Sequence, residues 1–167
     1  MANGFVVADS RHAEAWQEKR FDIYFAMVKY SPRGGAVSWI MKKMKILVVD
    51  NEMPATMMAV SLLTQIGFEV QVATKAKKGM EIAKWEKFDL ILLEANLPEI
   101  SGLEIYAELK QRHISYQTPV IFLCSRGGNE CRERALALGA DDFIEKPFEA
   151  EDFISRVLAC VEETETV

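Results

Sequence analysis

Residues 46–52 read ILVVDNE, and this stretch decides the fold class. Its four consecutive aliphatic residues suit a short strand that is buried in a parallel sheet. Two acids and an amide follow at once, so the strand is expected to end at a polar edge. Pro54 comes next, and proline is favoured in the first turn of a helix. The stretch therefore predicts a buried strand, a polar loop and a helix, in that order.

The same pattern recurs along the rest of the chain. Apolar runs alternate with helical patterns that end at glycine or at polar residues, and Thr74 is placed to cap one of these helices. Such alternation predicts an α/β fold, with a flavodoxin-like, doubly wound sheet of five parallel strands in the order 2-1-3-4-5 and five helices. The expected strands are residues 46–49, 70–72, 90–93, 119–123 and 143–144, and the expected helices are residues 54–66, 74–87, 102–112, 129–138 and 149–161.

Charge divides the 167 residues into two segments. Residues 1–44 hold seven Lys or Arg and four Asp or Glu, a net charge of +3, whereas the rest of the chain carries −8. The first segment is expected to be an N-terminal extension, either helical over residues 13–30 or poorly ordered. The regular pattern fills residues 45–165, which are expected to form one domain.

Composition narrows the function classes. Half of the residues are hydrophobic and the net charge is −5, which fits a globular protein and gives no reason to expect nucleic acid as a partner. The longest apolar runs are too short to span a membrane. Three scattered cysteines do not form a disulfide framework, and they suit a reducing compartment. We therefore expect a cytoplasmic protein.

Polar residues follow four of the predicted strands. The carboxyl ends of parallel strands meet at one edge of a sheet, and ligands bind there in open α/β folds. A carboxylate group facing a lysine at that edge provides oxygen ligands for Mg²⁺ and a cation for a phosphoryl group. The residues concerned are Asp50, Asn51 and Glu52 after the first strand, Glu94 and Asn96 at the third, Cys124 at the fourth, and Lys146 at the fifth.

Four segments resemble the receiver domain of response regulators in two-component systems. They are residues 46–52 (ILVVDNE), 89–102 (DLILLEANLPEISG), 119–125 (PVIFLCS) and 139–148 (GADDFIEKPF). The resemblance covers about 120 residues, in order and at normal spacing. It implies that a histidine kinase or a phosphotransfer protein is a partner, and that the protein is a signalling module and not an enzyme.

The resemblance also implies roles for single residues. Glu94 takes the place of the phosphate-accepting aspartate, and Asp50, Asn51 and Glu52 form the acidic pocket. Mg²⁺ would be held by Asp50, Asn51, Glu94 and the backbone carbonyl of Asn96. Cys124, Phe143 and Lys146 take the phosphoryl-contact and switch positions, and the peptide bond before Pro147 is a candidate for the cis form.

Three residues depart from the family pattern in that one pocket. Glu94 is one methylene longer than aspartate, which displaces its carboxylate by about 1.5 Å. Asn51 has one negative charge less than the usual acid, and Cys124 replaces a hydroxyl with a weak hydrogen-bond donor. Phosphoryl transfer depends on placement, so we expect weak or absent phosphorylation. Glu94 is then either a built-in mimic of the phosphorylated state or a partner in a structural ion pair with Lys146.

Three functions compete on this evidence. The first is a stand-alone atypical receiver, expected because no effector domain follows residue 161, that acts by contact with a kinase, a phosphotransfer protein or a downstream target. The second is a pseudo-receiver that is locked in one state. The third, a cofactor-binding flavodoxin-like enzyme, is disfavoured because acids stand where a glycine-rich phosphate turn is needed. The acidic face of the last helix, with Glu149, Glu151 and Asp152, is a candidate surface for a homodimer or another partner.

Overall fold

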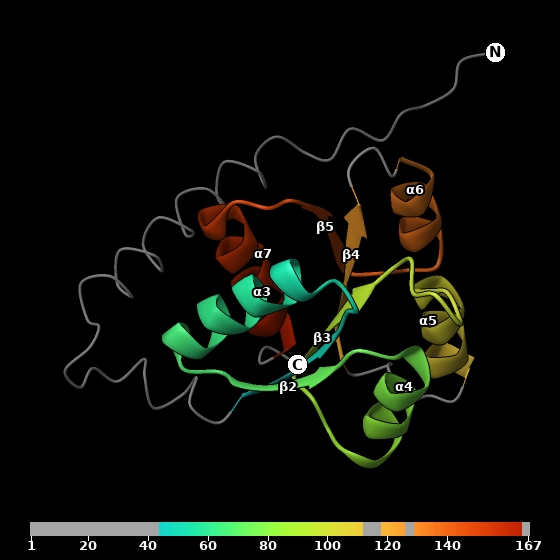
Figure 1. Ribbon diagram of the computed structural model, residues 1–167, viewed down its shortest axis with the longest axis horizontal. Coiled ribbons are helices and arrows are strands. Elements are labelled where there is room, and N and C mark those ends of the chain that lie inside the picture. Colours follow the sequence, from blue (N-terminus) through green and yellow to red (C-terminus); the bar gives the residue numbers. More distant parts are fainter. Residues whose placement is uncertain (1–43, 112–117, 126–128, 165–167) are drawn as a thin grey trace. The chain divides into compact units, whose positions relative to one another are not determined.

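A computed structural model describes residues 44–111, 118–125 and 129–164 (Figure 1). The predicted N-terminal extension, residues 1–44, therefore lies outside the described residues except for Met44. Within them, five parallel strands form one sheet in the order β2-β1-β3-β4-β5, which confirms the predicted topology. The strands are β1 (Lys45–Val49), β2 (Glu69–Ala73), β3 (Leu90–Glu94), β4 (Val120–Ser125) and β5 (Asp142–Lys146).

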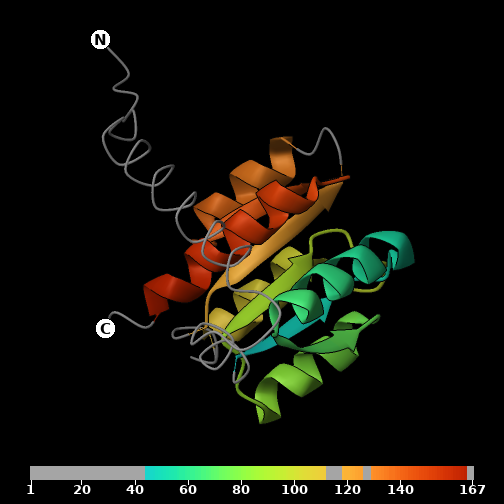
Figure 2. The same ribbon diagram turned by 90° about the vertical axis from the view of Figure 1, so that its left-hand side faces the viewer.

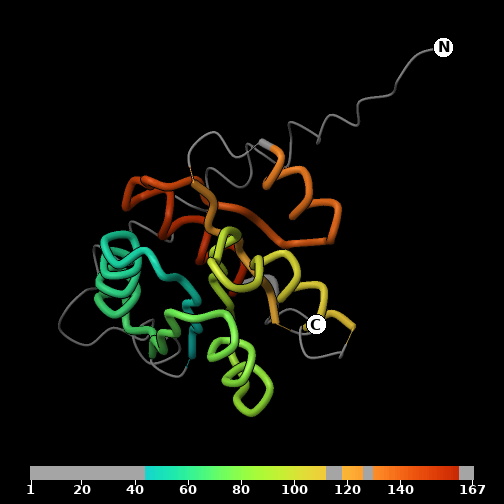
Figure 3. The backbone as a smooth tube through the Cα atoms, turned by 45° about the vertical axis from the view of Figure 1, so that its right-hand side comes forward, coloured from blue at the N-terminus to red at the C-terminus, as the bar shows by residue number. Residues whose placement is uncertain are grey.

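Five helices in the described part of the chain connect and flank the strands. They are α3 (Met53–Ile66), α4 (Ala76–Trp85), α5 (Gly102–Gln111), α6 (Asn129–Ala137) and α7 (Ala150–Thr164). Helices α3 and α7 pack beside each other on one face of the sheet, and α4 packs beside α5 on the other (Figure 2). The tube view shows α6 on the same side as α4 and α5 (Figure 3). The sheet is therefore covered on both faces, as the continuous apolar strands require.

The core has two layers because side chains alternate across a strand. Leu47, Leu93 and Phe122 belong to the layer under α4, α5 and α6. The fully buried Tyr106 of α5 joins this layer edge-on to Phe122, with ring centroids 5.4 Å apart. Its hydroxyl donates a hydrogen bond to the carbonyl oxygen of Gly139 at 2.5 Å, which ties α5 to the segment before β5.

Several predicted boundaries were wrong by a few residues. Thr74 does not cap α4, because Lys75 is the N-cap residue and makes no side-chain cap hydrogen bond. Helix α4 ends at Trp85 and not near residue 87. Strand β4 extends to Ser125, since Cys124 and Ser125 pair with β5. These differences are small, but the last one places Cys124 inside a strand.

Candidate functional site

Strands β1, β3 and β5 bring three predicted residues into contact at their carboxyl ends. Asp50 follows β1, Glu94 ends β3 and Lys146 ends β5. Asp50 is fully buried, and Glu94 and Lys146 are 3% and 6% exposed. The Lys146 ammonium lies 3.2 Å from Asp50 Oδ2 and forms an ion pair with Glu94 Oε2. Ionisable groups are rarely buried to this degree unless they are paired, and here each has a partner of opposite charge.

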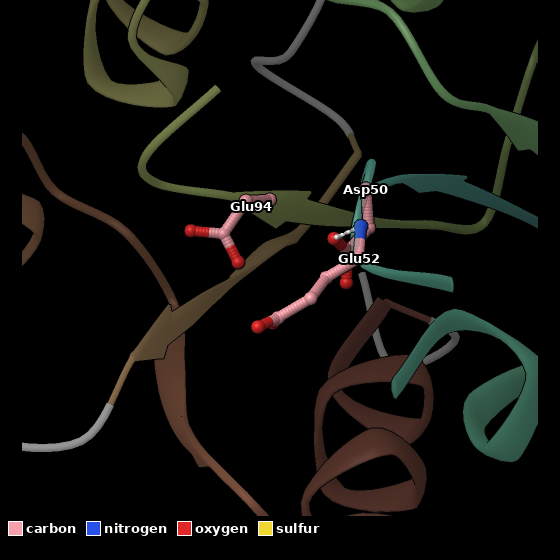
Figure 4. Close-up of side chains that lie close together, drawn as sticks. All are labelled: Asp50, Glu52 and Glu94. Atoms are coloured by element: carbon pink, nitrogen blue, oxygen red, sulfur yellow. Dashed lines mark hydrogen bonds between the residues drawn. The ribbon is translucent and has the colours of Figure 1, made fainter. Parts of the chain in front are cut away.

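A third carboxylate completes the cluster. Glu52 Oε2 lies 2.5 Å from Lys146 Nζ, although the Glu52 side chain is 56% exposed. One carboxylate oxygen from each of Asp50, Glu52 and Glu94 lies within 4.8 Å of the others (Figure 4). The acidic pocket was predicted as Asp50, Asn51 and Glu52; from here on the name denotes the residues in contact, which are Asp50, Glu52, Glu94 and Lys146.

Backbone groups hold the two buried carboxylates in place. Asp50 Oδ1 accepts a hydrogen bond from the backbone N–H of Glu52 at 2.8 Å (Figure 4). Glu94 Oε1 accepts one from the backbone N–H of Asn96 at 2.7 Å. Asp50 thereby fixes the turn after β1, as aspartate side chains commonly do two residues before a backbone donor, and Glu94 makes the corresponding contact after β3. The side-chain positions in the pocket are therefore coupled to the loops after β1 and β3.

The charge balance of the pocket favours the ammonium form of Lys146. Burial alone would lower the pKa of Lys146, but the close ion pairs with Glu52 and Glu94 and the charge of Asp50 outweigh it. The pKa therefore lies above its ordinary value of 10.5. Lys146 is thus a permanent cation at neutral pH. The peptide bond between Lys146 and Pro147 is cis.

The donor chemistry of the pocket fits a divalent cation. Three carboxylates within 4.8 Å provide the hard oxygen ligands that Mg²⁺ prefers. Two of the predicted ligands, Asp50 and Glu94, belong to this cluster. Its third member is Glu52, which was not predicted to bind the metal. Asn51 and Asn96 are exposed beside it. Bound there, a divalent cation would supply positive charge that offsets the carboxylates and a negatively charged ligand.

Sequence reasoning missed two residues that shape the pocket. Thr56 is buried, and its hydroxyl donates a hydrogen bond to the carbonyl oxygen of Glu52 at 3.0 Å. Gly102 lies against β3, where a Cβ atom would be only 2.1 Å from the carbonyl oxygen of Glu94. A threonine four residues after Glu52 and a glycine at the start of a helix are weak signals, so the sequence alone did not single them out.

The remaining predicted site residues lie on β4 and β5. Cys124 is 2% exposed and belongs to the core layer under α4, α5 and α6. Phe143 is half-buried, and the guanidinium groups of Arg132 and Arg156 lie 4.5 and 5.9 Å from the centre of its ring. The two arginines hold the ring through cation–π contacts. Phe143 is therefore tied to α6 and to α7.

Cys124 should be a poor nucleophile in the folded protein. Burial raises the pKa of its thiol, and the neighbouring thiol of Cys131 and the Glu94 carboxylate raise it further. We expect iodoacetamide at pH 8 to alkylate the half-buried Cys131 at least about tenfold faster than Cys124. Peptide mass spectrometry of native and urea-unfolded samples measures both rates. Rapid native labelling of Cys124 would contradict the buried placement.

Comparison with known proteins agrees with this geometry. The family model described as response regulator receiver domain matches residues 46–158. The transcriptional regulatory protein CpxR of Klebsiella pneumoniae is 37% identical over 115 residues, which are 69% of this chain and 48% of the relative. The phosphate regulon transcriptional regulatory protein PhoB of Pseudomonas aeruginosa is 34% identical over 119 residues, 71% and 52% of the two chains. The chain thus spans about half the length of the curated relatives it matches.

Solved structures share the fold. A CheY-like response regulator receiver domain from Methanospirillum hungatei superposes with a TM-score of 0.66 at 27% identity, over 73% of this chain and 96% of that one. NtrX from Brucella abortus gives a TM-score of 0.68 at 29% identity, over 72% of this chain and 27% of that one. The family match and the strand order agree, and this chain belongs to the response regulator receiver domain family of two-component signalling.

Proposed function

We propose that this receiver acts in two-component signalling by protein contact, with weak or absent phosphorylation at Glu94. Response regulators interact with histidine kinases and phosphotransfer proteins, so such a protein or a downstream target is the proposed partner. The observation that carries the proposal is the contact between Glu94 and Lys146. In the receiver pattern the acceptor is an aspartate, and the longer Glu94 side chain already contacts the lysine that would otherwise contact a phosphoryl oxygen.

The chemistry of the pocket supports weak phosphorylation. The Glu94 carboxylate would have to attack a phosphorus atom while it is ion-paired to Lys146 and hydrogen-bonded to the backbone of Asn96. Both contacts stabilise its negative charge and reduce its readiness to react. The Cys124 thiol is a weaker donor than a hydroxyl for a phosphoryl oxygen. Asn51 brings one charge less to the cation that would assist the transfer.

The carboxylate of Glu94 also places a fixed negative charge at the phosphate-accepting position. It differs from a phosphoryl group, which carries about −1.5 to −2 and three acceptor oxygens. A receiver held in one state by this charge is the pseudo-receiver form of the same proposal. The two forms differ in whether the protein responds to a phosphoryl donor.

Treatment with Mg²⁺ and acetyl phosphate separates these forms. We expect the intact mass of the wild-type protein to remain unchanged, because Glu94 is misplaced by about one carbon–carbon bond. The triple variant Asn51→Asp, Glu94→Asp and Cys124→Thr restores the usual residue types, and it should gain the mass of one phosphoryl group. Glu94→Gln in the wild-type background is the control. Phosphorylation of the wild type that disappears in Glu94→Gln would refute the proposed loss.

Helix α7 is the proposed surface for a partner or for a second copy of the chain. Its first turn carries the exposed acids Glu151 and Asp152, preceded by Glu149. Arg156 forms ion pairs with Asp142 and Asp152 at 2.9 Å and contacts the ring of Phe143. This network links the helix surface to β5, which ends in Lys146. Sedimentation of the wild type and of Arg156→Ala tests whether a dimer forms through this face.

The relatives named as transcriptional regulators are about twice as long as the matched segment. We propose that the segment described here recognises protein and not nucleic acid, since its net charge is negative. We also propose a cytoplasmic location, which the thiol form of Cys124 and Cys131 supports. Among the described residues, the helices are too short or too polar to cross a membrane.

A further inference from the structure

Glu52 differs from the other carboxylates of the acidic pocket. Asp50 and Glu94 are buried, and each accepts a backbone hydrogen bond in addition to its contact with Lys146. The Glu52 side chain is 56% exposed and reaches Lys146 from the loop before α3. We propose that Glu52 is a positioning residue for Lys146, and that it competes with anions for the lysine ammonium. The inference rests on the proposed function in one respect, that the acidic pocket is the signalling site.

The three carboxylate contacts of Lys146 occupy all of its hydrogen-bond donors. An ammonium group has three N–H donors and no acceptor. Lys146 Nζ contacts three carboxylates, which belong to Asp50, Glu52 and Glu94. An anion that enters the pocket must therefore displace one of them. The Glu52 contact is the easiest of the three to displace, because its side chain is 56% exposed and accepts no backbone hydrogen bond from the described residues.

The net charge of the acidic pocket favours cations over anions. Three carboxylates and one ammonium sum to −2, which repels phosphate and attracts a divalent cation. Loss of the Glu52 charge leaves −1 and weakens one of the three contacts of the lysine. The same change removes one oxygen ligand from the cluster that fits a divalent cation. Glu52 therefore shifts the preference of the pocket from anions toward cations.

The variant Glu52→Gln separates this role from a structural one. The backbone N–H of Glu52 still donates to Asp50 and its carbonyl oxygen still accepts from Thr56, so the fold is expected to be unchanged. NMR titrations of the full chain use inorganic phosphate alone and Mg²⁺ alone as probes. We expect phosphate to bind about fivefold more tightly and Mg²⁺ about fivefold more weakly than in the wild type. The ¹⁵N resonance of Lys146 Nζ should also shift before any ligand is added.

Two further variants complete the test. Glu99→Gln removes the same charge from an exposed position in the loop after β3, and it should leave the Lys146 Nζ resonance unchanged. Glu52→Asp keeps the charge but shortens the reach, so it should shift the Lys146 resonance and retain most of the Mg²⁺ affinity. Equal changes of both affinities in Glu52→Gln and Glu99→Gln would overturn the proposal, as would an unshifted Lys146 resonance in Glu52→Gln.

The test is independent of phosphorylation. It uses no phosphoryl donor, so it gives the same answer whether or not Glu94 accepts a phosphoryl group. A shifted Lys146 resonance together with phosphorylation of the wild type would support the role of Glu52 and refute the proposed loss of phosphorylation. An unshifted Lys146 resonance together with an unphosphorylated wild type would refute the role of Glu52 and support the proposed loss of phosphorylation.

Discussion

Lys146→Met is expected to lower the free energy of unfolding by about 3–5 kcal/mol at neutral pH. The substitution leaves the buried carboxylates of Asp50 and Glu94 facing each other without their cation. Breaking a buried ion pair from one side is costly because the remaining charge keeps the desolvation penalty without the attraction. Urea unfolding followed by circular dichroism measures the change. Addition of Glu94→Gln to Lys146→Met should recover part of the loss, since it removes one of the two facing charges.

The effect of Lys146 depends on pH in a direction that follows from its raised pKa. A group whose pKa is higher in the folded than in the unfolded state contributes stability that is complete below the unfolded value. That contribution is lost only as the pH rises above the ordinary value of 10.5. The difference in the free energy of unfolding between the wild type and Lys146→Met should therefore shrink as the pH rises above 10.5.

Lys78→Met is the matched control for Lys146→Met. Lys78 forms an ion pair with Glu81 at 3.1 Å, but both side chains are about 60% exposed. Exposed pairs contribute little, so this substitution should change stability by less than about 1 kcal/mol. If Lys146→Met cost no more than Lys78→Met at neutral pH, the acidic pocket would not be the buried ionic cluster described above.

Gly102→Ala is expected to destabilise the protein by about 3 kcal/mol. A Cβ atom at this position would lie 2.1 Å from the carbonyl oxygen of Glu94 and 3.1 Å from the Cα atom of Ala95. Both are backbone atoms, so no side-chain rotation relieves the overlap. The end of β3 must shift, and Glu94 must shift with it. The variant should therefore also change the NMR resonances of Glu94 and Lys146.

Gly67→Ala shows what a glycine substitution costs without such a contact. Gly67 has a φ of +110° after α3, and a Cβ atom there would meet nothing within 4 Å. The expected loss is about 1 kcal/mol, which comes from the left-handed backbone conformation alone. Urea unfolding of both variants gives the comparison. A smaller loss for Gly102→Ala than for Gly67→Ala would mean that α5 does not constrain the end of β3.

The fold could be predicted from the sequence because the signals for each strand and helix are short sequence patterns that recur along the chain. The apolar run at residues 46–49 and its later counterparts mark buried strands wherever they occur, and the alternation with helices leaves few topologies. The errors fall at element ends, where local signals compete. At Thr74 the capping propensity predicted the helix start, yet the chain begins α4 after Lys75. Ladder pairing with β5 extended β4 beyond its apolar run.

The sequence by itself determined that Asp50, Glu94 and Lys146 lie at one edge of the sheet, because parallel strands must end together. Only the tertiary structure decided which side chains touch. Lys146 and Asp50 are 96 residues apart, and their contact depends on strand order, register and side-chain conformation at once. The partnership of Glu52 with Lys146 and the closeness of Gly102 to Glu94 have the same origin. The periodicity of residues within one helix or strand reports which face is buried, but it does not report which residues of a distant segment contact that face.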